Sequence, residues 1–241
     1  MGIGSFGRVR VFEDFLGAPD VTTGGTTALT RVCGLTQLAV GAPTLAQTVD
    51  EPGGVLSIQT GATDDNNCVL YAGPFKPADG GCVIEARFKC NSASLGAIYC
   101  GFSETLATTP VMPAESATTA LTINGSGGMA GMLWDPDRDT DDWVAVAGDG
   151  GAVASDLATA TGTVSGQGDL VADEWDIVRV ELDVNGDAKI YHDGALIDDV
   201  KACVTASDVQ HAILMVEARS AVARIMEVDF FYAEGGRDWT V

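Results

Sequence analysis

The sequence predicts an all-β protein, folded as a two-sheet antiparallel sandwich. Short apolar runs recur along the 241-residue chain, roughly every 8–15 residues, and Gly, Asn and Asp residues typical of turns separate them. Several runs alternate apolar and polar residues, which is the period of a strand that buries one face. No window carries a helical apolar stripe longer than about ten residues. Residues 200–211 are the one place where we expect a short helix.

The first fifty residues differ in composition from the rest of the chain. They are rich in Gly, Thr and Ala and contain one short apolar run, residues 9–12. We therefore expect residues 1–50 to form an extended N-terminal arm with irregular edge strands. No Pro- or Ser-rich linker interrupts the remaining chain, so residues 51–241 are expected to form one β-sandwich domain.

Residues 82–90 give the clearest strand pattern in the middle of the chain. Apolar and charged side chains alternate there, with Cys82, Ile84, Ala86, Phe88 and Cys90 on one face and Glu85, Arg87 and Lys89 on the other. This pattern predicts a half-buried antiparallel strand. Further on, residues 118–123 and 129–134 flank the Asn-Gly-Ser-Gly-Gly segment of residues 124–128, which predicts a β-hairpin.

The C-terminal third repeats the strand pattern. In the strand expected at residues 175–183, every second side chain faces the core, and these are Asp176, Val178, Val180 and Leu182. The dipeptide at residues 185–186, Asn-Gly, predicts a tight hairpin after this strand. Residues 212–217 and 224–232 are expected to form a last strand pair. Trp175 is expected to close the end of the sandwich.

Residues 175–196 contain a motif that identifies a fold family. They read Trp-x-x-x-x-Val-x-Leu-x-x-Asn-Gly-x-x-x-x-Tyr-x-Asp-Gly-x-Leu. This run resembles the central hairpins of concanavalin-A-like and laminin-G-like jelly rolls. The resemblance implies a jelly-roll sandwich and no particular activity, because the fold carries lectins, glycosidases and structural domains.

Both ends of the chain resemble a group of tailed-bacteriophage virion proteins. The resemblance rests on residues 8–15, 228–232 and 237–239, which read Arg-Val-Arg-Val-Phe-Glu-Asp-Phe, Val-Asp-Phe-Phe-Tyr and Arg-Asp-Trp. It implies a capsid decoration (cement) protein, made in the host cytoplasm and located on the outer capsid surface of the virion. Such a protein would bridge copies of the major capsid protein as a homotrimer. The contacts expected in the arm and at the C-terminus are Val9, Val11, Phe12, Phe15 and Trp239.

The charge balance excludes two classes of partner. Thirteen Lys and Arg residues stand against 34 Asp and Glu residues, which gives a formal net charge of −21. Binding to phosphates takes clustered cations, so neither nucleic acid nor an anionic membrane surface is expected as a partner. The six cysteines form no Cys-x-x-Cys pair. We expect them to be reduced and buried, although their even number leaves a disulfide alternative open.

An acidic run is the candidate metal site. Residues 135–142 read Asp-Pro-Asp-Arg-Asp-Thr-Asp-Asp. Alternate carboxylates in a loop can collect Ca²⁺, and the candidate ligands are Asp135, Asp137, Asp139 and Asp141. The run departs from an EF-hand, because Thr140 and Val146 occupy the positions of the required Gly and Glu. A solvated acidic loop is the competing interpretation, and no cofactor is expected.

Catalytic patterns are missing from the sequence, so we expect the protein not to be an enzyme. Glycosidases of this fold carry Glu-x-Asp-x-x-Glu on one strand. Glu227 and Asp229 come nearest to that pattern, without the third acid. No Gly-x-Ser-x-Gly elbow occurs, and the two histidines, His192 and His211, are expected at the surface or at strand caps.

A glycan-binding module, used in host or surface attachment, is the alternative to the virion interpretation. Such a module needs exposed aromatic side chains beside polar groups. The candidates near predicted strand ends are Trp134, Trp143 and Trp239.

Overall fold

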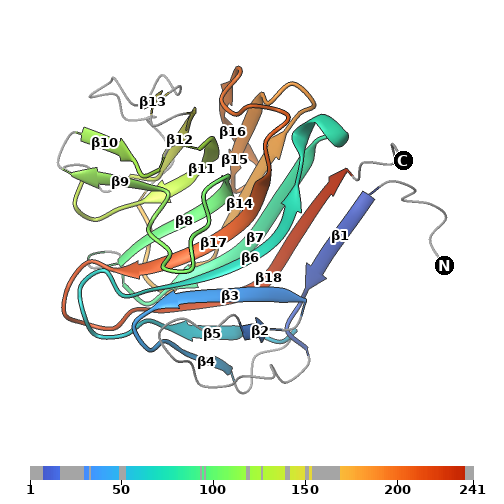
Figure 1. Cartoon of the computed structure of the whole chain (residues 1–241). Helices are drawn as coiled ribbons and strands as arrows, with labels where there is room; N and C mark the ends of the chain where they lie inside the picture. The colour runs from blue at the N-terminus through green and yellow to red at the C-terminus, as the bar shows by residue number, and fades with distance from the viewer. Residues whose placement is uncertain are drawn as a thin grey trace.

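Two eight-stranded antiparallel sheets form the body of the protein in the computed structural model (Figure 1). The structure describes residues 8–16, 30–32, 34–48, 53–92, 94, 96–117, 120–125, 127–138, 142–149, 152–153 and 169–236. The two layers confirm the predicted all-β sandwich.

The first sheet, named sheet A, contains β1 (Arg8–Glu13), β4 (Thr44–Gln47), β5 (Leu56–Gln59), β7 (Cys82–Cys90), β14 (Asp176–Leu182), β15 (Ala188–His192), β16 (Ala195–Val200) and β18 (Ile225–Gly236). The second, sheet B, contains β2 (Thr30–Val32), β3 (Leu35–Val40), β6 (Asn67–Phe75), β8 (Gly96–Ser103), β11 (Met129–Trp134), β12 (Val144–Asp149), β13 (Ala152–Val153) and β17 (Gln210–Ala218). A separate hairpin pairs β9 (Ala114–Ala117) with β10 (Ala120–Ile123), and one short 3-10 helix, η1, spans Pro77–Asp79.

Strands far apart in the sequence lie side by side in both sheets. Sheet A has the order β16-β15-β14-β7-β18-β5-β4, and β1 also pairs with β18. Sheet B has the order β13-β12-β11-β8-β17-β6-β3-β2. The central strands β7 and β18 of sheet A therefore lie opposite β8 and β17 of sheet B in the two layers (Figure 1).

The alternation read in the sequence decides which side chains of sheet A enter the core. In β7 and β14 every second residue is buried, and the residues between them are partly exposed. The register places Val180 of β14 opposite Ile84 of β7, and both side chains are fully buried. The predicted parity of residues 176–182 is confirmed, and so is the Asn-Gly hairpin that joins β14 to β15.

The central strands of sheet B are buried on both faces. One face meets sheet A in the main core, where Phe88, Phe102, Trp134 and Leu214 pack together. The other face carries a second apolar cluster, in which Tyr99 and Met215 of the sheet pack with Met112, Ala114 and Ile123 of the covering segment. That segment is the β9–β10 hairpin and the chain before it, so β8, β11 and most of β12 are buried throughout.

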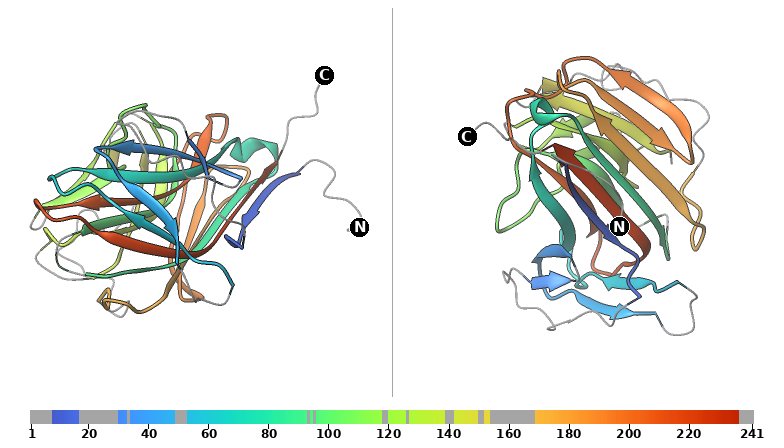
Figure 2. Two further views of the ribbon diagram at one scale, coloured as in Figure 1. Left: turned by 90° about the horizontal axis from the view of Figure 1, so that it is seen from below. Right: turned by 90° about the vertical axis from the view of Figure 1, so that its right-hand side faces the viewer.

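The described part of the first fifty residues belongs to the edges of both sheets. β1 lies alongside the C-terminal half of β18, with Arg8 opposite Gly236 and Glu13 opposite Phe231 (Figure 2). β3 pairs with β6, and β4 pairs with β5. The described part of the segment expected to form an arm with irregular edge strands thus supplies strands to both sheets.

Three local expectations are wrong. β10 pairs with β9, and β11 pairs with β8 and β12, so the glycine-rich segment of residues 124–128 does not join a hairpin. β17 and β18 lie in different sheets and are not a strand pair. Residues 201–209 form turns and no helix, because their many short polar residues hydrogen-bond locally.

The described cysteines are buried thiols, as expected. Cys68, Cys82, Cys90, Cys100 and Cys203 are free, and Cys33 lies outside the described residues. The part of the chain that the structure describes contains no helix with the length and apolar character that a membrane crossing requires.

Candidate functional site

The outer face of sheet A is a broad polar surface that faces solvent. The covering segment buries the corresponding face of sheet B, whereas the outward residues of β7, β14 and β18 stay partly exposed. This face therefore offers a continuous strand surface to a ligand.

Ion pairs cross the outer face of sheet A from strand to strand. Arg87 Nη1 lies 2.7 Å from Asp229 Oδ2, and Lys89 Nζ lies 2.9 Å from Glu227 Oε2. Arg179 bonds to Glu85 on the neighbouring strand at 2.8 Å. Nearly every cation on this face is thus matched by a carboxylate, which leaves hydrogen-bonding groups held in place with little net charge.

Trp175 lies on this face, immediately before β14. The guanidinium carbon of Arg87 is 4.6 Å from the centre of the Trp175 ring, and Lys89 Nζ is 4.7 Å from it. Cation–π attraction at these distances fixes the ring over β7. Because the side chain stays partly exposed, part of its ring surface remains open to solvent.

Two further aromatic side chains extend the surface across the sheet. Phe230 of β18 lies opposite Arg87 in the register. The Phe230 ring is 6.3 Å from the ring of Phe12 on β1, and Phe12 is 59% exposed. Trp175, Phe230 and Phe12, with Arg87 between the first two, are named here the aromatic row. The row crosses β7, β18 and β1.

The contact residues predicted in the N-terminal arm have different surroundings. Phe12 and Val9 are exposed, at 59% and 40%. Val11 is partly buried and packs against the main core. Phe15 is wrong as a surface contact, because it is 1% exposed and belongs to the core. Trp239 lies outside the described residues.

Two of the three tryptophans predicted as sugar platforms, Trp134 and Trp143, lie in the core instead of at the surface. Trp134 and Trp143 are both 1% exposed, and their rings meet at 6.0 Å inside the core. Trp175, predicted to close the sandwich, instead lies partly exposed on the outer face of sheet A. It precedes Asp176, whose parity faces inward, so alternation turns Trp175 to the outer face.

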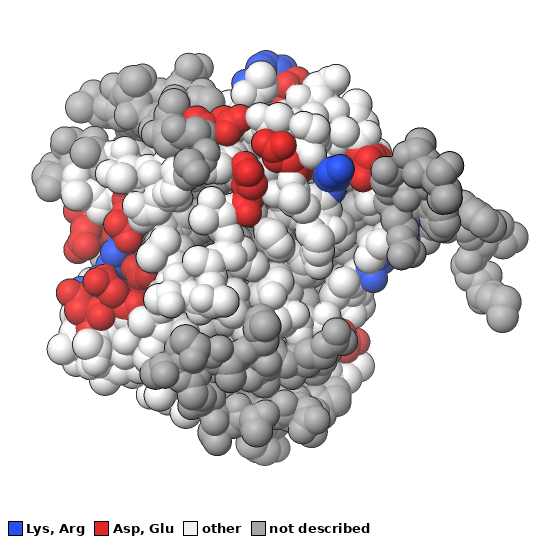
Figure 3. Space-filling view, in the orientation of Figure 1, with Lys and Arg blue, Asp and Glu red and all other residues white. Residues whose placement is uncertain are grey.

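Arg219 already pairs with one carboxylate of the acidic run at residues 135–142. Asp135 Oδ2 accepts hydrogen bonds from Arg219 Nη2 and from the Ser116 amide, both at 2.8 Å. Burial and the neighbouring Asp135 charge raise the pKa of Asp137. Figure 3 shows acidic side chains gathered near the end of β17, at the left of the view. Asp139 and Asp141 lie outside the described residues.

Three of the residues considered for catalysis, Glu227, Asp229 and His192, have structural partners. Glu227 and Asp229 form the ion pairs with Lys89 and Arg87 described above. His192 is not at the surface: it is 5% exposed, and its Nε2 lies 2.8 Å from Asp176 Oδ1. His211 is partly buried, and burial lowers its pKa.

Comparison with known proteins identifies the fold. No family model matches the chain, and no curated protein matches its sequence. A protein of unknown function from Shewanella oneidensis MR-1, SO2946, is 13% identical with a TM-score of 0.58, covering 100% of this chain and 91% of that one. The carbohydrate recognition domain of Emp47p is 12% identical with a TM-score of 0.53, covering 98% of this chain and 100% of that one.

A third structure, the cellulose induced protein Cip1, is 14% identical with a TM-score of 0.52 and covers 83% of this chain and 89% of its own. Likeness at these identities concerns the fold alone. The protein is a two-sheet β-sandwich with a concanavalin-A-like fold, which confirms the fold that the first of the two resemblances implies. None of these comparisons supports the resemblance to virion proteins.

Proposed function

We propose that the protein is a glycan-binding module that holds a neutral sugar chain on the aromatic row. The observation that carries this proposal is Trp175, held over Arg87 and Lys89 on an open polar face. The fold shared with a carbohydrate recognition domain supports the proposal as well. A bound chain is released unchanged, and no catalytic step is assigned to any residue.

The chemistry of this face suits a sugar ring. A pyranose has an apolar C–H face, which stacks on an aromatic ring, and hydroxyl groups at its rim. The paired groups of Arg87 with Asp229 and Lys89 with Glu227 provide fixed donors and acceptors for those hydroxyls. The rings of Phe230 and Phe12 continue the surface, so a chain of several sugars fits better than a monosaccharide.

The test is a glycan array followed by titration of the best ligand by calorimetry. Trp175→Ala is expected to weaken binding by at least about tenfold, because removing an aromatic anchor from an interface commonly costs about 2 kcal/mol or more. Phe12→Ala is expected to weaken it less, since Phe12 lies at the end of the row.

The matched control is Leu196→Ala. Leu196 is 54% exposed on β16, at the far edge of the same sheet. Its removal is expected to leave the affinity unchanged. An array without hits, or equal affinities for wild type and Trp175→Ala, would overturn the assignment of this face.

A second candidate function, capsid decoration in a virion, is favoured by β1. Among the described residues this strand pairs only with β18, and its Val9 side chain is 40% exposed. A strand with one unpaired edge can be extended by a strand from a neighbouring protein. We propose that a homotrimer would use β1 in this way against the major capsid protein, with no part for nucleic acid or membrane.

The number of copies of this protein in purified particles distinguishes glycan binding from capsid decoration. Quantitative mass spectrometry of purified particles would give a fixed ratio to the major capsid subunit if the protein decorates shells. Val9→Ser is then expected to lower shell occupancy, while Trp175→Ala leaves it unchanged. A point variant is needed here, because deletion of residues 1–15 would also remove the buried Phe15. Absence of the chain from particles would exclude decoration.

A further inference from the structure

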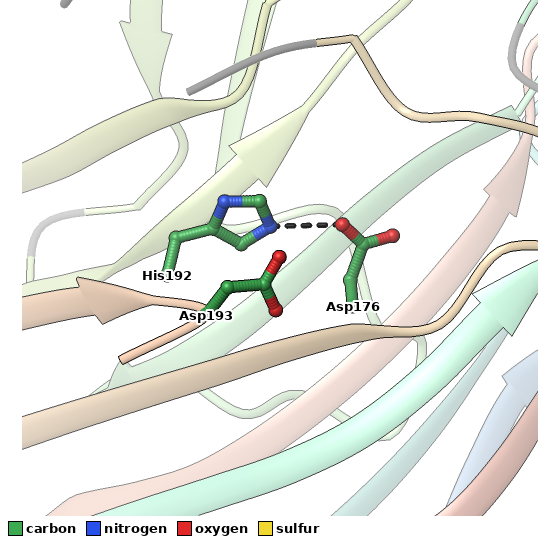
Figure 4. Close-up of side chains that lie close together, drawn as sticks. All are labelled: Asp176, His192 and Asp193. Atoms are coloured by element: carbon green, nitrogen blue, oxygen red, sulfur yellow. Dashed lines mark hydrogen bonds and ion pairs between the residues drawn. The ribbon is translucent and has the colours of Figure 1, made fainter. Parts of the chain in front are cut away.

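One group of mixed metal-ligating side chains lies at the open end of the hairpin formed by β14 and β15, next to Trp175. Asp176 is the first residue of β14, His192 is the last of β15, and Asp193 follows in the turn. One ligand atom from each lies within 4.8 Å of the others. Figure 4 shows the His192 ring and the Asp176 carboxylate bonded together, with the Asp193 carboxylate beside that bond.

The backbone holds the three side chains in this arrangement. The Asp193 amide donates to Ile177 O at 2.8 Å, and the Ile177 amide donates to Asp193 Oδ1 at 2.9 Å. Asp193 has a φ of 47°, a left-handed conformation that Asp and Asn tolerate well. The His192 ring packs 5.4 Å from the ring of Trp143 in the core. The site is therefore assembled before any ligand arrives.

One carboxylate oxygen of this group is buried without a hydrogen-bond partner among the described residues. Asp176 is 8% exposed, and its Oδ2 is buried and accepts no hydrogen bond from the part of the chain that the structure describes. Its Oδ1 is bonded to His192, and the second carboxylate, that of Asp193, lies close by. A carboxylate removed from water needs a nearby cation or a full set of hydrogen bonds.

We propose that Asp176, His192 and Asp193 bind one divalent transition-metal ion of the Zn²⁺ type. Imidazole nitrogen and carboxylate oxygen together are a donor set that Zn²⁺ accepts, whereas Ca²⁺ and Mg²⁺ prefer oxygen alone. Three protein ligands leave a further position for water. This site is distinct from the acidic run at residues 135–142, where Asp135 already pairs with Arg219.

The test is calorimetric titration of the chelator-treated full chain with ZnCl₂, in a background of CaCl₂ that occupies nonspecific sites on the acidic surface. The wild type is expected to bind one equivalent of Zn²⁺. Asp193→Asn is expected to weaken binding by at least about tenfold, because it removes a charged ligand. The asparagine keeps the left-handed turn and the bond from Ile177, so the fold is retained.

The chain offers a matched control, since it has only two histidines. His192→Gln is expected to abolish stoichiometric Zn²⁺ binding, and His211→Gln to leave it unchanged. Circular dichroism and thermal unfolding of each metal-free variant show whether it is folded. Absence of stoichiometric binding, full competition by Ca²⁺, or wild-type affinity in Asp193→Asn would each overturn the site.

Discussion

Glu217 is buried beside the guanidinium of Arg219, yet its pKa is raised to about 7. Its Oε1 lies 3.0 Å from Arg219 Nη1, and Asn67 Nδ2 donates to its Oε2 at 3.2 Å. Both contacts favour the ionised form, but burial opposes them more strongly. Arg219 also pairs with Asp135, Glu115 and Asp65, so its charge is shared among four carboxylates.

This raised pKa predicts a loss of stability as the pH increases. The folded state holds the Glu217 proton more tightly than the unfolded state does, so its contribution is complete at and below about pH 4.5 and lost as the pH rises to about 7. A shift of this size changes the free energy of unfolding by an amount on the order of 3 kcal/mol between these pH values. Glu217→Gln is expected to remove that dependence.

Urea denaturation at about pH 5 and about pH 7.5 measures the effect. The difference in free energy of unfolding between variant and wild type should shift in favour of the variant at the higher pH. Other titrating groups contribute equally to both proteins and cancel. A difference that is the same at both pH values would show that Glu217 titrates normally.

Alanine variants of Phe12 and Phe15 measure how much each side chain of the N-terminal segment contributes to the stability of the fold. Phe15→Ala is expected to lower the free energy of unfolding by about 3–5 kcal/mol, because it empties a buried site. Phe12→Ala removes the same atoms from a side chain that is 59% exposed, and is expected to cost less than about 1 kcal/mol. Equal urea midpoints for the two variants would contradict the placement of Phe15 in the core.

The pairing of β8 with β11 depends on two glycines that face each other. Gly101 lies opposite Gly131 in the register. The Tyr99 ring covers the pair, and a Cβ on Gly131 would come within 2.6 Å of Tyr99 Cζ. The Tyr99 hydroxyl donates to Phe102 O at 2.7 Å, so the ring cannot move away without losing that bond.

Gly131→Ala is accordingly expected to destabilise the sheet by about 1–3 kcal/mol through overpacking. In a Tyr99→Ala background the same change is expected to cost less, because the clashing ring is gone while the close contact of the new Cβ with Cys100 O, at 2.7 Å, remains. Thermal unfolding of the four proteins forms a double-mutant cycle that isolates this contact. Equal costs in both backgrounds would show that the ring does not limit the space.

The elements of sheet A were the more predictable ones. One face of this sheet meets solvent, so apolar and charged residues alternate along β7 and β14. This alternation is visible in the sequence. Sheet B was harder, because β8, β11 and most of β12 are buried on both faces and their small apolar residues carry no period of two. Their partners could not be inferred, which explains the wrong hairpin at residues 124–128.

The candidate sites depend on contacts between elements, so the sequence predicted only parts of them. The hairpin that joins β14 to β15 was visible, but the register that brings His192 to Asp176 was not. Trp175 was visible as a tryptophan before a strand, and its parity already opposed that of the core residues. Its cation neighbours Arg87 and Lys89 come from a strand that the sequence does not place next to it.

At the scale of the whole molecule, the net charge of −21 is expected to have little influence on a ligand bound to the outer face of sheet A. The charges of sheet A's outer face are paired with one another, as Arg87 with Asp229 and Arg179 with Glu85. A neutral glycan on this face should bind with little dependence on salt. Titrations at about 50 mM and about 500 mM NaCl are expected to give affinities within about threefold. A steep decline would indicate an anionic ligand instead.

The rate at which the buried thiols are alkylated can measure how often the protein unfolds locally. Burial raises the pKa of Cys68, Cys82 and Cys203 to about 12, so almost no reactive thiolate exists near neutral pH while the chain is folded. In a Cys33→Ser variant, each thiol of the described residues can be alkylated only after the segment around it unfolds. Cys82 reports on sheet A and Cys68 on sheet B, so equal modification rates would mean that the two layers separate in one cooperative event.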